Sequence, residues 1–142
     1  MLKENKYVDL AVGQKAFISR EITEKDIMDF AKISGDMNPL HVDKTYAKKA
    51  TFKNIIAHGI LTAALISAVL GTKLPGPGYI YLQQEIKFLK PVFPGDTISV
   101  EVEITKKINE KKSLELSFTC TNQRNQIVLG GSSIIKAPPS LY

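Results

Sequence analysis

One stretch near the middle of the chain constrains the fold more than any other. Residues 58–73 read His-Gly-Ile-Leu-Thr-Ala-Ala-Leu-Ile-Ser-Ala-Val-Leu-Gly-Thr-Lys and carry no charge before Lys73. Helical spacing puts their apolar side chains around most of the circumference, and a helix of this kind is expected to be buried on all sides. At 1.5 Å per residue it would be about 24 Å long, the span of a small domain. The sequence therefore predicts a long central helix that other elements surround.

The second half of the chain alternates apolar and polar residues with the period of two that is typical of half-buried β-strands. The pattern covers residues 79–89, 97–107, 113–121 and 126–137, and Gly130-Gly131 indicates a bulge in the last segment. Such alternation is typical of an antiparallel sheet with one solvated face. The side chains expected to face inward are Ile80, Leu82, Ile86 and Phe88, then Ile98, Val100, Val102 and Ile104, then Leu114, Leu116, Phe118 and Cys120.

The first half of the chain predicts one strand and two helices. Residues 15–22 indicate the strand. Thr23 is a good N-cap with acidic residues just after it, and the helix that it starts is expected to end at Ser34. Residues 35–41 contain Gly, Asp, Asn and Pro and are expected to form a loop, and residues 44–49 a short helix.

These elements predict an α+β fold, with a five-stranded antiparallel sheet rolled around one long buried helix. A chain of 142 residues is expected to form a single domain, residues 1–142, because it is too short for two independent cores. A rolled sheet leaves open strand edges, and pairing between two copies would cover them. We therefore expect a homodimer.

Composition excludes several classes of protein. With 44% hydrophobic and 23% charged residues the chain is not disordered, and the single Cys120 excludes a disulfide framework and a Cys-rich zinc module. The longest apolar run, residues 60–70, is too short to cross a bilayer, and the charged N-terminal residues lack the apolar core of a signal peptide. We expect a cytoplasmic protein that binds no membrane.

The basic residues do not predict a nucleic-acid partner. The net charge is +5 and the pI about 9.3, but the positive side chains are spread along the chain. The densest group, residues 106–112, contains an acidic residue and no aromatic one, which is typical of a solvated hairpin tip. A modest positive field also suits an anionic small molecule.

Asp36 and His41 are the first candidates for chemistry, because a carboxylate and an imidazole together can take a proton from water and return one to carbon. Asn38 lies between them and can orient the water or the acid. The alternative is that Asp36 and Asn38 only form a turn. A metal site is weaker, because Pro and Leu stand where a calcium loop needs further ligands, and no second His or Cys group is expected to complete a zinc site.

Three further residues lie on or beside the central helix. His58 and Gly59 open it, and the unpaired N–H groups at a helix start can hold an oxyanion. Gly59 has no side chain to block approach, although it could serve only tight packing. Ser67 lies two turns further on, on about the same face, where it could contact a ligand or simply bond back to the Ala63 carbonyl. Cys120 is expected to be inert core.

A recognisable signature lies in residues 34–41, Ser-Gly-Asp-Met-Asn-Pro-Leu-His. It resembles that of the (R)-specific enoyl-CoA hydratases, the MaoC-like branch of the hot-dog fold, and above all the short bacterial hydratases that feed polyhydroxyalkanoate synthesis. The resemblance covers about residues 12–137. It continues through Ile-Ala-His-Gly at 56–59, the small-residue helix, Leu-Pro-Gly-Pro-Gly-Tyr-Ile-Tyr at 74–81 and Phe-Leu-Lys-Pro-Val-Phe-Pro-Gly-Asp at 88–96.

The resemblance implies roles for particular residues. The implied catalytic pair is Asp36 and His41, which would hold and activate a water molecule. The Gly59 N–H would polarise the carbonyl of a thioester. The full set of implied oxyanion- and substrate-binding residues is Gly59, Asn38, Ser67 and His58.

The implied reaction is syn addition of water to a trans-2-enoyl-CoA, giving an (R)-3-hydroxyacyl-CoA reversibly, with no cofactor and no metal. The implied partners are the acyl-CoA substrate and a second copy of the chain. Two alternatives keep the same fold: an acyl-CoA thioesterase, and a non-catalytic module that binds acyl-CoA or an acyl carrier. The sequence leaves open the length of the acyl chain and whether the acyl group is carried by CoA or by an acyl-carrier protein.

Overall fold

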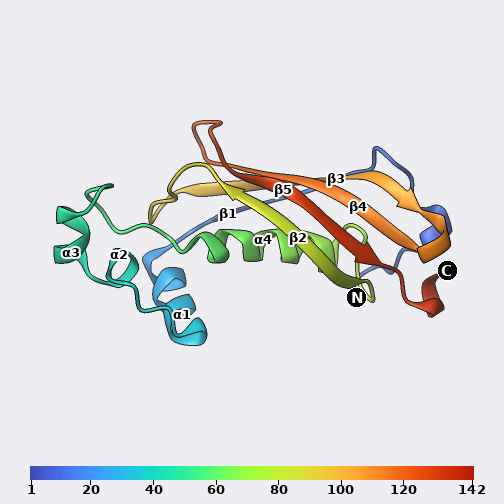
Figure 1. Cartoon of the computed structure of the whole chain (residues 1–142), viewed down its shortest axis with the longest axis horizontal. Helices are drawn as coiled ribbons and strands as arrows, with labels where there is room; N and C mark the ends of the chain where they lie inside the picture. Colours follow the sequence, from blue (N-terminus) through green and yellow to red (C-terminus); the bar gives the residue numbers. More distant parts are fainter.

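The computed structural model describes residues 1–142 and places one antiparallel sheet across a long helix (Figure 1). The strands lie in the order β1-β3-β4-β5-β2. The shorter helices gather beyond the N-terminal end of the long helix, while the chain termini lie toward the other end (Figure 1). The predicted α+β fold is confirmed. The bounds are β1 Lys15–Glu21, α1 Glu24–Ser34, α2 Pro39–Val42, α3 Lys44–Lys49, α4 Gly59–Thr72, β2 Ile80–Phe88, β3 Thr97–Ile108, β4 Ser113–Thr121 and β5 Ile127–Lys136.

The centre of the sheet confirms the predicted alternation. The four inward residues of β3 and the four of β4 are all at most 2% exposed. Register pairs Val100 with Cys120 and Val102 with Phe118, so apolar side chains meet apolar side chains on the face toward α4. Burial also raises the pKa of the Cys120 thiol to about 12, in agreement with its expected place as inert core.

The long helix departs from its prediction on one side. The apolar pattern predicts burial all round, but a stripe of α4 is exposed, and Ile60 in it is 58% exposed. The sheet crosses only one side of α4, so this chain alone cannot cover the opposite side. The stripe consists of Ile60, Ala64, Ser67, Ala68 and Gly71.

The edge strand β2 corrects a second prediction. Its pairing with β5 shifts register between Tyr81 and Gln83, which marks a bulge. A bulge moves the following side chains to the other face. Tyr81 before the bulge and Ile86 after it can therefore both pack against the core, which pure alternation would not allow. Three residues expected inside, Ile80, Leu82 and Phe88, are more than half exposed.

The glycine pair of β5 is not a bulge. Gly130 and Gly131 pair regularly with β4 and β2, and the irregularity falls instead opposite Cys120 and Thr121. The glycines permit close approach, because a Cβ on Gly131 would lie 1.9 Å from the Glu85 carbonyl oxygen. None of the helices combines the length and the apolar character that a membrane-spanning segment requires.

Candidate active site

The segment that follows α1 is shaped by side chains bonding to backbone groups. Helix α1 ends at Gly35, whose φ of 77° reverses the chain. The Asn38 N–H then donates to Asp36 Oδ1 at 3.1 Å, and Asn38 Oδ1 accepts from the Leu40 N–H at 3.0 Å. Asp36 and Asn38 thus do form turns, as the alternative to a catalytic role supposes. These turns also determine where the Asp36 carboxylate lies.

His41 lies in a helix rather than in the expected loop. Asn38 caps helix α2 and Pro39 occupies its first turn, a combination that starts a helix readily. His41 Nδ1 lies 2.7 Å from the Ile56 carbonyl oxygen. Because a carbonyl only accepts, Nδ1 carries the proton, and in the neutral ring Nε2 keeps a lone pair that can act as a base.

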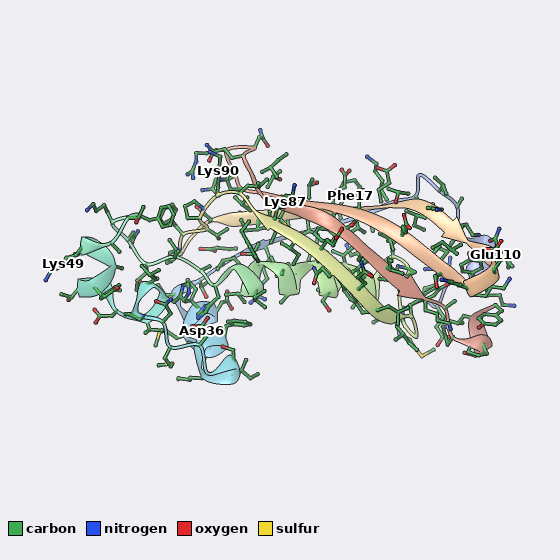
Figure 2. All side chains as sticks on the ribbon, in the orientation of Figure 1. Phe17, Asp36, Lys49, Lys87, Lys90 and Glu110 are labelled. Atoms are coloured by element: carbon green, nitrogen blue, oxygen red, sulfur yellow. The ribbon has the colours of Figure 1, made fainter.

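His58 joins the two predicted catalytic residues. Its ring is 2% exposed and stacks on the His41 ring, with centroids 3.9 Å apart and planes 29° apart. Its Nε2 lies 3.0 Å from the Asp36 backbone oxygen. One ligand atom from each of Asp36, His41 and His58 lies within 4.8 Å of the others. Figure 2 shows Asp36 at the helical end of the molecule, with Glu110 of the basic hairpin tip at the opposite end.

Gly59 begins α4 directly after His58, so its amide starts the long helix beside the cluster. The first amides of a helix have no partner within it and carry partial positive charge. Gly59 also lines a cavity of about 270 Å³ together with Ile60, Thr62, Phe88 and Lys90. A Cβ on Gly59 would lie 2.5 Å from Phe88 Cε1, so a larger residue here would collide with the cavity wall.

Ser67 lies outside this cluster. It is exposed on the uncovered stripe of α4 and lines a second hollow of about 280 Å³. Phe30 and Tyr81 line the same hollow, and Phe30 also contacts the His58 ring, with centroids 4.8 Å apart. The pattern predicts neither residue as part of a site, because both are spaced like ordinary core residues. Burial raises the pKa of the Tyr81 hydroxyl to about 12.

The donor set does not suit a metal ion. The fold brings His58, 22 residues from Asp36 in sequence, next to the predicted pair. A metal binds imidazole in the plane of the ring, at about 2.1 Å. Two rings stacked within 29° direct their lone pairs side by side rather than toward one point. The arrangement instead suits acid–base chemistry beside a helix N-terminus.

Comparison with known proteins shows the family to which the chain belongs. The family model for the MaoC like domain matches residues 10–124. The chain belongs to the MaoC-like domain family. The match extends from β1 to the β4–β5 turn and includes the capped turns, α4 and most of the sheet.

MaoC-like relatives resemble the chain over nearly its whole length. An (R)-specific enoyl-CoA hydratase of Rhodospirillum rubrum is 45% identical over 93% of this chain and 91% of its own. A 3-hydroxybutyryl-CoA dehydratase of Methylorubrum extorquens is 42% identical over 93% of this chain and 83% of its own. An R-hydratase of Pseudomonas aeruginosa, solved unliganded, superposes with a TM-score of 0.89 at 44% identity, over 95% of this chain and 86% of that one. The hot-dog fold expected from the sequence is confirmed.

Proposed function

We propose that the protein hydrates trans-2-enoyl-CoA to (R)-3-hydroxyacyl-CoA and catalyses the reverse dehydration, as a hydro-lyase. The observation that carries this proposal is the cluster of a carboxylate and a bare imidazole nitrogen beside the start of α4. The names of the most similar relatives, hydratases and a dehydratase of CoA thioesters, support it.

The dyad supplies the water. Asp36 Oδ1 is engaged by the Asn38 N–H, so Asp36 Oδ2 and His41 Nε2 are the atoms free to hold a water molecule. His41 takes one proton of this water as its oxygen adds to C3 of the enoyl group, and the dyad returns a proton to C2 from the same side. The elements of water are thus added syn, with no change of oxidation state that would require a redox cofactor or a metal. Asn38 supports the geometry through its two hydrogen bonds.

The start of α4 stabilises the charge that builds on the thioester oxygen. The Gly59 N–H points from a helix N-terminus, where backbone amides and the helix dipole favour an anion. Loss of one such donor typically costs about 3–4 kcal/mol of transition-state stabilisation. Lys90, which is exposed beside the Gly59 cavity, adds positive charge that suits the phosphates of CoA or an acidic carrier. Ser67 and its hollow are the place that we assign to the acyl chain.

We also propose that two copies form the working unit. The exposed stripe of α4 and the open edge of β2 lie next to each other around Ile60 and Tyr81, where the hollow that contains Ser67 opens to solvent. Ile60 is exposed on this stripe, and Ile80 and Leu82 are exposed on the edge strand β2. Such an exposed apolar surface marks an interaction site, and a second copy would bury it.

The proposed activity is tested with crotonyl-CoA. Hydration removes the absorbance band of the enoyl thioester, and chiral analysis of the product should give the (R) isomer. A thiol reagent run in parallel should detect no free CoA, whereas a thioesterase would release it.

Asp36→Asn and His41→Ala should each lower hydration by two or more orders of magnitude while the protein stays folded, because each removes one half of the dyad. Turnover measured by loss of the absorbance band checks this. Asp29→Asn, an exposed carboxylate on α1 that pairs only with Lys25, is the matched control and should retain activity. Near wild-type turnover in both dyad variants would show that the assignment is wrong.

A further inference from the structure

We infer that His58 is a positioning residue, which acts through Asp36 and His41 and does not bind the substrate. The inference rests on the function proposed above and replaces the substrate-binding role that the sequence assigns to His58. At 2% exposure, the side chain has almost no surface that a substrate could touch. Its ring stacks on the His41 ring and is contacted at a tilt of 59° by Phe30.

The contact to Asp36 fixes the protonation of the ring. Nε2 lies 3.0 Å from the Asp36 carbonyl oxygen, which can only accept, so Nε2 carries the proton and donates. In the neutral ring, Nδ1 is then left with a lone pair, and it is buried without any partner. His58 is therefore the opposite tautomer to His41, whose Nδ1 donates to the Ile56 carbonyl.

An unpaired buried nitrogen is a cost that calls for an explanation. A phenylalanine could fill the same space and stack in the same way without leaving a polar atom unsatisfied. The one thing that histidine adds is the N–H donor to Asp36. This bond holds the backbone of an exposed residue, in a turn that is otherwise fixed only by local contacts.

His58 also connects the parts of the site to one another. Its side chain holds Asp36 and backs the His41 ring, while its own carbonyl accepts from the Leu61 N–H at 3.0 Å in the first turn of α4. Asp36, His41 and the Gly59 amide thus all adjoin the same buried residue, His58. Such support is what keeps catalytic groups in a productive geometry.

The ring tautomers give a test that does not depend on activity. The chain contains only two histidines, so protein labelled with ¹⁵N-histidine shows just the two rings in question. At alkaline pH we expect one Nδ1–H ring and one Nε2–H ring, and His58→Phe should remove the Nε2–H signal. If both rings are Nδ1–H tautomers, His58 does not donate to Asp36 and the inference is wrong.

Kinetics test what the contact does. His58→Phe keeps an aromatic ring but loses the donor, and should lower kcat at least tenfold with KM changed less than threefold. His58→Gln places an amide N–H at about the reach of Nε2 and should recover most of the lost kcat. A kcat near wild type in His58→Phe, a rise in KM larger than the fall in kcat, or no recovery in His58→Gln would each overturn the inference.

The remaining controls separate this inference from the proposed function. Ser113→Ala removes a buried polar group at the far end of the sheet and should keep kcat within twofold, and thermal unfolding checks that every variant is folded. Wild-type protein that hydrates no enoyl thioester would contradict the proposed function, whereas the tautomers would still show whether His58 holds Asp36.

Discussion

Backbone carbonyls decide the chemistry of the two histidine rings. The Ile56 carbonyl accepts a hydrogen bond from His41 Nδ1–H, and the Asp36 carbonyl accepts one from His58 Nε2–H. Each ring is thereby held in one tautomer, and His41 presents a bare Nε2 as a base. None of these acceptors can be inferred from residue type, because every residue carries a carbonyl. The sequence indicates which side chains are reactive, and the fold decides which of their atoms remain free.

Gly59→Ala should test whether the missing side chain at the start of α4 gives the substrate access to the amide or serves only packing. The added Cβ would lie 2.5 Å from Phe88 Cε1, so the single variant should lose stability and at least tenfold in kcat/KM. Phe88 is 55% exposed, and truncating it gives the new methyl group room. We expect Gly59→Ala combined with Phe88→Ala to regain stability but not activity, measured against Phe88→Ala alone. Recovery of both would show that the missing side chain at Gly59 matters only for packing against Phe88.

At the scale of the element, local sequence determines where α1 begins and ends, whereas contacts between strands determine which residues of β2 face the core and what role the glycines of β5 have. Helix α1 begins and ends where the sequence predicts, because Thr23 and Asp26 form a reciprocal capping box and Gly35 takes the left-handed conformation. The faces of β2 and the use of the β5 glycines do not follow from local pattern. They depend on a bulge and on close contact between two strands distant in sequence.

The glycines of β5 offer a matched pair of substitutions. Gly131→Ala would put a Cβ 1.9 Å from the Glu85 carbonyl oxygen, while at Gly130 the nearest atom is 3.7 Å away. We expect Gly131→Ala to lower the free energy of unfolding by about 1–3 kcal/mol, as overpacking does. Gly130→Ala should change it by less than about 1 kcal/mol. Urea unfolding of both variants checks this, and equal effects would contradict the close approach of β2 and β5.

The capping box of α1 predicts a pH-dependent stability. The backbone N–H of Thr23 donates to Asp26, and this bond, with smaller help from the Thr23 hydroxyl and Arg20, holds the pKa of Asp26 below its usual range. Because the folded pKa lies below the unfolded value of about 3.9, the contribution is fully present above that value and is lost as the pH falls through the folded pKa.

Asp26→Asn should therefore destabilise the protein at pH 7, by about 1 kcal/mol if it acts as a typical cap. The difference from wild type should shrink as the pH is lowered below about 4. Denaturant unfolding at a series of pH values measures it, and Asp29→Asn in the same helix is the control. A difference that is constant from pH 7 to pH 2 would contradict this account.

At the scale of the whole molecule, the uncovered face of α4 is the main open feature. Its exposed positions are mostly small, Ala64, Ser67, Ala68 and Gly71, which would allow a second helix or strand to approach closely. The hollow beside Ser67 lies on this same face, so a partner copy would close it and shield an acyl chain from water.

Ala68→Arg should disrupt the proposed dimer, because it places a charge in the middle of the face that a second copy would bury. Light scattering at micromolar concentration should give twice the chain mass for wild type and the single-chain mass for the variant. Lys32→Ala, a change on the outside of α1, should leave the mass unchanged. A wild-type mass of one chain would rule out the proposed homodimer.

The sequence by itself determined the elements other than α2, the core of β3 and β4 and the residue types of the site, because periodicity, caps and turn formers act within a few residues. Tertiary structure decided the rest: the uncovered side of α4, the inward face of β2, the close approach at Gly131 and the stack of His58 on His41. These features depend on distances between segments far apart in the chain. Local pattern carries no information about such distances, which are set when the sheet closes over one side of the helix.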